Sequence, residues 1–168
     1  MSNSTVNIRS AVNEIVRDYK PGSPECTSLK AKLAEIENES YEIPIIIDGE
    51  EIHTGNKSPC RKPHDHQIIL AEYHKSGAEE VHKAIDVAMD AWFSWSNLPL
   101  SERTAIFRRA AELLAGPWRD TINAATMLNQ SKNVYQAEID AACELIDFWN
   151  FNCWYAQEIY AQQPMYSP

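Results

Sequence analysis

A long helix-forming run, Lys132–Tyr160, is the feature that most constrains how this chain can fold. Its apolar side chains recur at steps of three and four residues, as in an amphipathic helix: Val134, Ala137, Ala141, Leu145, Phe148, Ala156 and Ile159. Polar side chains occupy adjoining strips of the same run: Gln136, Asp140, Glu144 and Asp147. A helix with this pattern is buried on most sides, so its carboxylates require partners or a cleft.

The amino-terminal part of the sequence contains a helix start. Ser23 supplies a hydroxyl cap, Pro24 suits the first helical position, and Glu25 places a carboxylate in the positive first turn. We therefore expect an amphipathic helix over residues 24–38, preceded by a partly ordered arm over residues 1–21.

Strand signals follow this helix. Ile43–Ile47 ends at Asp48-Gly49 and a second short strand follows at once, which is the signature of a tight hairpin. Pro44 within the first strand predicts an edge position. After a turn-rich segment, Gly55–Pro59, the run Gln67–His74 predicts a further strand.

The hydrophobic period becomes helical from Ala78 onwards. One face of the first helix carries Val81, Ile85, Ala88, Met89 and Trp92. Ser101 is a candidate cap for a second helix, Gly116-Pro117 ends it, and a third is expected over Trp118–Asn129. The chain thus divides into three segments: 1–40 with the arm and amphipathic helix, 41–76 with the hairpin and strand, and 77–168 with the remaining helices.

Charge and hydropathy exclude two classes of partner. The formal net charge is −9, whereas phosphate binding needs clustered Lys and Arg, and Arg108-Arg109 is too short a basic patch. No apolar run approaches the roughly 20 residues that span a bilayer, and Met1–Ser10 lacks the apolar core of a secretory signal. We expect a soluble intracellular protein with no nucleic-acid and no membrane partner.

The cysteines and histidines are the candidates for disulfide bonds, nucleophilic thiols and metal ligands. Cys26, Cys60, Cys143 and Cys153 show no C-x-x-C pair, which fits reduced thiols, and the acidic neighbours of Cys143 favour packing over catalysis. Cys153, between two aromatic residues, is also expected to be packed. His64-Asp65-His66, with Cys60 and His53 or His74, places donor atoms in one window, but no second ligand knuckle is present, so we expect no metal site.

Two further features leave alternatives open. Gln136, Glu138 and Asp140 form either a polar network or a solvated strip, and the usual behaviour of charged helix faces favours the solvated strip. Glu144 and Asp147 lie on one side of the helix, where a shared cationic partner is conceivable.

The aromatic residues lack interleaved basic residues, so they do not form a base-stacking platform. They are Trp92, Phe93, Trp95, Phe148, Trp149, Phe151, Trp154 and Tyr155. We interpret them as helix–helix core plus a surface made for another part of a larger protein, so some of these rings should be exposed.

Several motifs carry a family resemblance. Arg103–Phe107 with Ala110–Leu114 resembles a helix of aldehyde dehydrogenases in general, and Gln136–Phe148 resembles the subfamily that oxidises L-glutamate γ-semialdehyde, the pyrroline-5-carboxylate dehydrogenases. Further similar stretches are Gly22–Glu25, Ile43-Pro44, Asp48–Glu50 and Gln162–Pro164. The resemblance implies the α/β aldehyde dehydrogenase fold, of which this chain would supply a mostly helical part with a small β-hairpin. Complete enzymes of the family are much longer, so the chain looks like an amino-terminal fragment that ends within the cofactor-binding domain.

Glu144 is the candidate site residue. In the resembling subfamily the glutamate of this motif lies beside the aldehyde tunnel, so the resemblance implies a substrate-orienting role near the catalytic thiol. A carboxylate on a packed helix can hold a substrate amine or steer a proton. The alternative is an ordinary ion-paired helix glutamate, and the two interpretations are evenly balanced.

The resemblance also implies NAD as cofactor, a small-molecule aldehyde as substrate, a homo-oligomeric parent enzyme and the mitochondrial matrix. The reaction requires a cysteine nucleophile, oxyanion donors and a general base, which in the family follow Pro168. The five glycines are scattered and form no phosphate loop. We therefore expect no catalytic or cofactor-binding residue in this chain and no activity from it alone. Met1–Asn13 carries only Arg9 as a basic residue, so no transit peptide is evident.

A second class of function stays open: a truncated, non-catalytic paralogue whose uncovered aromatic face docks on a partner. A monomer that unfolds cooperatively would favour this alternative, whereas aggregation or a molten state would favour a piece of the enzyme.

Overall fold

The computed structural model describes residues 7–162. The first six residues of the predicted arm, and the last six of the predicted helical segment with Gln163-Pro164 among them, lie outside this range. In chain order the elements are α1 (Pro24–Asn38), β1 (Tyr41–Ile43), β2 (Ile45–Ile47), β3 (Glu50–Ile52), β4 (Lys57–Lys62), β5 (Asp65–His74), α2 (Ala78–Asn97), α3 (Leu100–Ala115), α4 (Arg119–Gln130), α5 (Val134–Ala137), the π-helix η1 (Glu138–Cys143) and α6 (Glu144–Ala161).

The strands form two small sheets. In the first the order is β1-β5-β4, with β1 parallel and β4 antiparallel to β5, while β2 and β3 form a separate antiparallel pair. The predicted continuous strand Ile43–Ile47 was wrong, because Pro44 divides it between the two sheets. Proline has no backbone N–H to give to a strand ladder, so one strand ends before it and the next begins after it.

The hairpin turn and the edge strand follow local chemistry. Asp48 (φ 55°) and Gly49 (φ 76°) both adopt the left-handed conformation that a two-residue hairpin turn needs, which confirms the hairpin. The prediction of a turn over Gly55–Pro59 was wrong from Lys57 onwards, where β4 begins. Pro59 is tolerated there because β4 lies at an edge of its sheet.

The helices largely match the sequence expectations. α1 has the predicted bounds, and the backbone N–H of Cys26 donates to Ser23 Oγ at 3.2 Å. The predicted cap at Ser101 was wrong, because α3 already begins at Leu100 and Pro99 occupies the cap position. The run Lys132–Tyr160 is helical from Val134, but it contains a π-helical segment that the sequence did not reveal.

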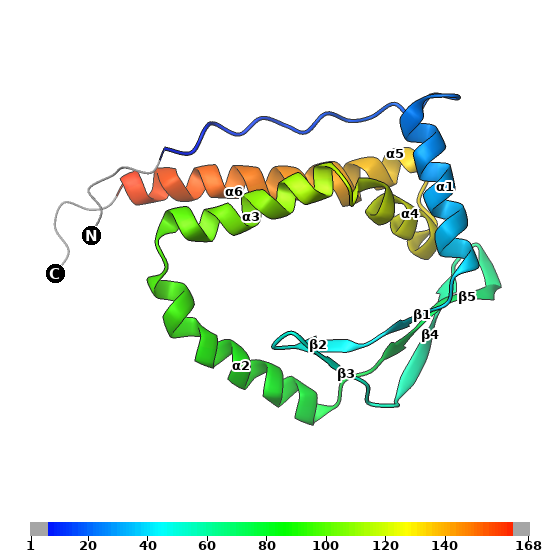
Figure 1. The fold of residues 1–168 in the computed structure, drawn as a ribbon, viewed down its shortest axis with the longest axis horizontal. Helices are drawn as coiled ribbons and strands as arrows, with labels where there is room; N and C mark the ends of the chain where they lie inside the picture. The colour runs from blue at the N-terminus through cyan, green and yellow to red at the C-terminus, as the bar shows by residue number, and fades with distance from the viewer. Residues whose placement is uncertain (1–6, 163–168) are drawn as a thin grey trace.

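Helices α3, α4, α5 and α6 form an elongated layer along one side of the molecule. The strands and α2 lie on the opposite side (Figure 1). α3 and α6 lie side by side, α1 packs on α4, and the arm of residues 7–22 extends along α6. α2 follows β5 and connects the strands to α3, and none of its residues is buried.

Two clusters of buried apolar residues hold the layer together. One contains Tyr19, Leu29 and Ala124, so it joins the arm and α1 to α4; the other contains Ala111, Leu114 and Ile146 and joins α3 to α6. The first cluster therefore unites two of the three segments that the sequence divides. Within residues 7–162, no helix combines the length and hydropathy that a membrane crossing requires.

Candidate functional site

The candidate site is built on the helix that runs through α5, η1 and α6. It starts with a reciprocal cap, in which Gln136 N–H donates to Asn133 Oδ1 at 2.9 Å and Asn133 N–H donates to Gln136 Oε1 at 3.0 Å. Inside η1 the buried residues are Glu138, Ala142 and Cys143. A π-helix closes i→i+5 hydrogen bonds, which places Glu138 and Cys143 about one turn apart. This spacing changes which face of the helix each later residue occupies.

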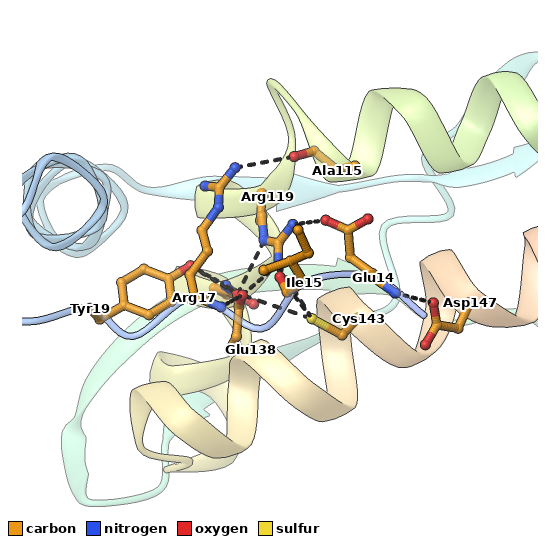
Figure 2. A network of polar contacts seen from close by, with 10 residues as sticks. Glu14, Ile15, Arg17, Tyr19, Ala115, Arg119, Glu138, Cys143 and Asp147 are labelled. Atoms are coloured by element: carbon orange, nitrogen blue, oxygen red, sulfur yellow. Dashed lines mark hydrogen bonds and ion pairs between the residues drawn. The ribbon is translucent and has the colours of Figure 1, made fainter. Parts of the chain in front are cut away.

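The Glu138 side chain is completely buried beneath this helix and forms the centre of a polar network (Figure 2). Its Oε1 accepts from Arg119 Nη2 at 2.5 Å and from the Arg17 backbone N–H at 2.8 Å. Its Oε2 accepts from Asn123 Nδ2 at 2.8 Å and from the Tyr19 hydroxyl at 2.9 Å. The expectation of a solvated strip was therefore wrong for Glu138, although Gln136 is exposed as expected.

The electrostatics of this network favour a charged pair. Burial alone would raise the pKa of Glu138, but the hydrogen bonds from Arg119, Arg17, Asn123 and Tyr19 outweigh it and lower that pKa to about 2. Desolvation would likewise lower the pKa of Arg119, yet its bonds to Glu138 and Glu14 raise it. Both groups are thus ionised, and the pair stays satisfied in the interior.

The same arginine and a neighbouring aspartate attach the arm to the helices. Arg119 Nη1 donates to Glu14 Oε1 at 2.6 Å and Nη2 donates to the Ile15 carbonyl at 2.7 Å. Asp147 accepts from the Glu14 backbone N–H at 2.7 Å and from Asn13 Nδ2 at 2.8 Å. Among the described contacts Asp147 therefore binds arm amides, and a cation shared with Glu144 is not its partner.

The cysteines on this helix are packed, as expected. Burial, followed by the charge of Glu138, raises the pKa of Cys143 to about 11, and its Sγ lies 3.3 Å from Arg119 Nη2. Burial also raises the pKa of Cys153. A thiol with a raised pKa is a poor nucleophile at neutral pH. All four cysteines of the chain are free thiols.

Glu144 begins α6, one residue after the buried Cys143, and its side chain is exposed. It borders two shallow hollows. The first, of about 390 Å³, is lined by Ile122, Thr126, Lys132, Asp140, Leu145 and Phe148 among others. The second, of about 470 Å³, is lined by Asn13, Asp147, Phe148, Phe151, Asn152 and Tyr155.

The surroundings of Glu144 suit a group that recognises a ligand. Within residues 7–162 its carboxylate has no protein donor, whereas nearby Asp140 is paired with Lys132 Nζ at 2.7 Å. Phe148, one turn further along, is 59% exposed, so an apolar wall borders the free carboxylate. Such an arrangement can bind an ammonium group beside an aliphatic chain. The ion-paired alternative is not what the described contacts show, and the substrate role stays a prediction.

Several of the aromatic rings singled out from the sequence are exposed. Trp92, Phe93 and Tyr155 are 63%, 71% and 51% exposed, so the prediction that some rings are exposed is confirmed.

The candidate metal donors around His64 do not share one site. His64 Nδ1 lies 2.7 Å from Ser131 Oγ, and Cys60 Sγ donates to Asn129 Oδ1. His53 and His74 do meet, beside Glu42.

The described glycines do not form the glycine-rich turn of a Rossmann-type dinucleotide site. Such a turn opens directly into a helix N-terminus. Here Gly22, Gly49 and Gly55 occupy isolated left-handed turns, and Gly116 follows a helix. Gly77 precedes α2, but its amide donates to Glu80.

Comparison with known proteins gives one consistent result. The sequence pattern of the family described as "Aldehyde dehydrogenase family" matches residues 51–167. The chain is similar to delta-1-pyrroline-5-carboxylate dehydrogenase of Agaricus bisporus, with 45% identity over 162 residues that cover 96% of this chain and 30% of that protein. It is also similar to the mitochondrial enzyme of that name from Dictyostelium discoideum, with 42% identity over 94% of this chain and 28% of that protein.

A solved structure agrees with these sequences. The crystal structure of Delta-pyrroline-5-carboxylate dehydrogenase from Mycobacterium tuberculosis, bound with NAD and cobalamin, superposes with a TM-score of 0.94 and 44% identity. The superposition covers 100% of this chain and 31% of that one. The chain thus spans about 30% of the length of the curated relatives it matches. The matched sequence, the shared fold and the predicted motifs lead to one conclusion: this chain belongs to the aldehyde dehydrogenase family.

Proposed function

We propose that this chain supplies the amino-terminal part of an NAD-dependent dehydrogenase that oxidises L-glutamate γ-semialdehyde to L-glutamate. The observation that carries the proposal is the 45% identity over 96% of the chain with a delta-1-pyrroline-5-carboxylate dehydrogenase. The reaction takes one aldehyde, one NAD⁺ and one water to one carboxylic acid, one NADH and one proton. Because the chain spans about 30% of its relatives, the catalytic thiol, the general base and the NAD site are assigned to the rest of the protein.

In this proposal Glu144 orients the substrate. The semialdehyde carries an ammonium group on a short aliphatic chain. Glu144 offers a carboxylate that has no donor among residues 7–162 and lies beside the exposed ring of Phe148. Charge-assisted hydrogen bonds of this kind fix the orientation of a small ligand. Glu138, six positions earlier, is saturated by protein donors and is not available for this role.

A chimera tests the proposed activity. Residues 1–168 replace the matching segment of the Mycobacterium tuberculosis enzyme, to which they are 44% identical, and NADH formation is followed with glutamate semialdehyde. We expect turnover from the chimera and none from residues 1–168 alone. A folded, NAD-binding chimera without turnover would refute the proposal, and turnover by the short chain would refute the assignment of the catalytic groups elsewhere.

Glu144→Gln in the same chimera tests the substrate role. We expect kcat/KM for glutamate semialdehyde to fall roughly 10- to 100-fold, because one charge-assisted bond is lost. The matched control is Glu112→Gln, which removes an exposed carboxylate of α3 that lines neither hollow and should leave kcat/KM unchanged. An aldehyde without an ammonium group should react equally well with the Glu144→Gln variant and its parent. Equal losses for both aldehydes, or no loss, would make Glu144 a structural residue.

We also propose that the complete protein is a homo-oligomer of the mitochondrial matrix. The exposed apolar stripe of α2 supports a larger assembly, and relatives such as that of Dictyostelium discoideum carry a mitochondrial designation. Light-scattering mass of the chimera and fractionation of cells that express the full protein test these two points. A monomeric mass, or a cytosolic location, would contradict them.

A non-catalytic interaction module is the second candidate, favoured by the absence of any buried residue in α2. Its apolar side chains would then bind a partner protein. Residues 1–168 would in this case behave as a monomer with a single cooperative unfolding transition. Aggregation and strong binding of a hydrophobic dye would instead support the enzyme proposal.

A further inference from the structure

The fold brings together three side chains that are distant in sequence. Glu42 lies in β1, which runs parallel to β5, and His74 is the last residue of β5. His53 directly follows β3 of the separate hairpin. Within residues 7–162, these three form the group whose metal-donor atoms all lie within 4.8 Å of one another.

The donor atoms form a compact triangle. Glu42 Oε1 is 2.8 Å from His74 Nε2 and 3.2 Å from His53 Nδ1, and the two nitrogens are 3.2 Å apart. Ligands of a tetrahedral zinc ion with bonds of 2.0–2.1 Å are about 3.3 Å apart, so the triangle has nearly the size of one face of that tetrahedron. Two imidazoles and one carboxylate also form the ligand set of open zinc sites.

We propose that Glu42, His53 and His74 bind a divalent transition metal ion of the Zn²⁺ class, with one coordination position open to solvent. This site lies apart from Glu144 and does not depend on the dehydrogenase proposal. His74 is buried, with 1% of its side chain exposed, and gives the site a fixed base. Glu42 and His53 are 46% and 48% exposed, so an ion can enter from solvent.

Neighbouring charged groups support the ligands. Lys57 Nζ donates to Glu42 Oε2 at 2.6 Å, which leaves Oε1 facing the imidazoles. His53 Nε2 lies 3.8 Å from Glu51 Oε2, which is longer than a hydrogen bond, so Glu51 would have to move closer to orient a metal-bound His53.

One contact must change when the ion binds. The Gly55 backbone N–H donates to His74 Nδ1 at 3.1 Å, which places the proton of neutral His74 on Nε2. Coordination through Nε2 requires that proton on Nδ1 instead, with no net change in proton number. The turn at Gly55 must then move its N–H away, and Gly55, at φ 74°, lies in a loop outside the strands.

The bound ion would join the two sheets. Glu42 and His74 belong to the β1-β5-β4 sheet, whereas His53 belongs to the hairpin of β2 and β3. An ion that binds the folded chain and not the unfolded chain stabilises it in proportion to the logarithm of its concentration. The expected consequence is a hairpin held against the sheet when Zn²⁺ is present.

The test is a Zn²⁺ titration of the protein by calorimetry, repeated with His53→Ala, Lys57→Met and His66→Ala. We expect one site per chain, an affinity loss of at least about 100-fold for His53→Ala, and about 10-fold for Lys57→Met, which removes an outer partner. His66→Ala is the matched control, since His66 is an exposed histidine at the other end of β5, and it should leave the affinity unchanged. His53 is the primary target because it is half exposed, whereas loss of the buried His74 could impair folding.

A second readout separates a built site from loose binding to surface histidines. Zn²⁺ should shift the amide NMR signal of Gly55 and speed its hydrogen exchange, because that amide loses its acceptor. Unchanged affinity in His53→Ala, equal loss in His66→Ala, or a Gly55 amide that ignores saturating Zn²⁺ would each overturn the proposal.

Discussion

Helices α4 and α2 have similar sequence patterns but differ completely in burial. Both alternate apolar and polar residues with helical periodicity, yet α4 buries Arg119, Asn123, Ala124, Thr126 and Leu128, whereas α2 buries none of its residues. On α2 the side chains of Ile85, Met89 and Trp92 are 53%, 66% and 63% exposed. Amphipathic periodicity thus shows that a helix has an apolar face. It does not show whether the described part of the chain also contains the residues that bury this face.

The largest expected difference concerns the charged centre of α4. Arg119→Met leaves the Glu138 carboxylate buried without its cation, and we expect a loss of about 3–5 kcal/mol in the free energy of unfolding. Urea denaturation followed by circular dichroism measures this loss.

The matched double variant sharpens this result. Arg119→Met with Glu138→Leu removes both charges from the interior and should recover most of the lost stability. If Arg119→Met lowers the free energy of unfolding by less than about 1 kcal/mol, the Glu138 carboxylate is accessible to solvent in the folded state.

Core packing gives the next largest effect. Leu128→Ala in α4 should cost about 2–5 kcal/mol, because Leu128 is buried at 4% exposure. Met89→Ala removes a side chain of comparable size from α2 and should stay within about 0.5 kcal/mol. Both are measured by urea denaturation. Equal losses would show that the α2 face is already covered, and the contrast between the two helices would fail.

Acid provides the mildest test of the buried network. The pKa of Glu138 is lowered to about 2 from an ordinary value near 4.5, so the folded form binds this proton less readily than the unfolded form. The resulting stability, on the order of 2 kcal/mol, is complete above about pH 4.5 and is lost as the pH falls towards 2. The free energy of unfolding, measured from pH 7 to 2, should show this loss below about pH 4.5. The Glu144→Gln variant should show the same loss. A profile that is flat below pH 4.5 would contradict the assignment.

Local chemistry explains which elements were predictable. The bounds of α1 followed from Ser23-Pro24, and the hairpin followed from Asp48-Gly49, because each signal acts within a few residues. β4 was missed because its partner β5 decides its pairing, whereas the turn-forming residues of Gly55–Pro59 predicted a turn.

The candidate site was predictable only in part. Glu144 was identified by its motif, and its exposed position is compatible with that role. The Glu138 network was missed because its donors Arg119, Asn123 and Tyr19 come from other elements, and because the five-residue steps of η1 do not appear in a search for steps of three and four. His53 and His74 were considered as donors together with Cys60, His64 and His66, but Glu42 was missed, because only the folded chain brings it beside them.

The wide turn of η1 gives this helix one place where its length can change. Hydrogen bonds that run i→i+5 hold one residue more in a turn than the i→i+4 bonds of an α-helix. Without one of the residues between Glu138 and Cys143, the segment can close as an α-helix, which keeps Ile146 in the interior and Asp147 beside the arm. In the regular helix α6, by contrast, one deleted residue rotates everything that follows by about 100°. A single-codon deletion should therefore be far less damaging inside η1 than inside α6.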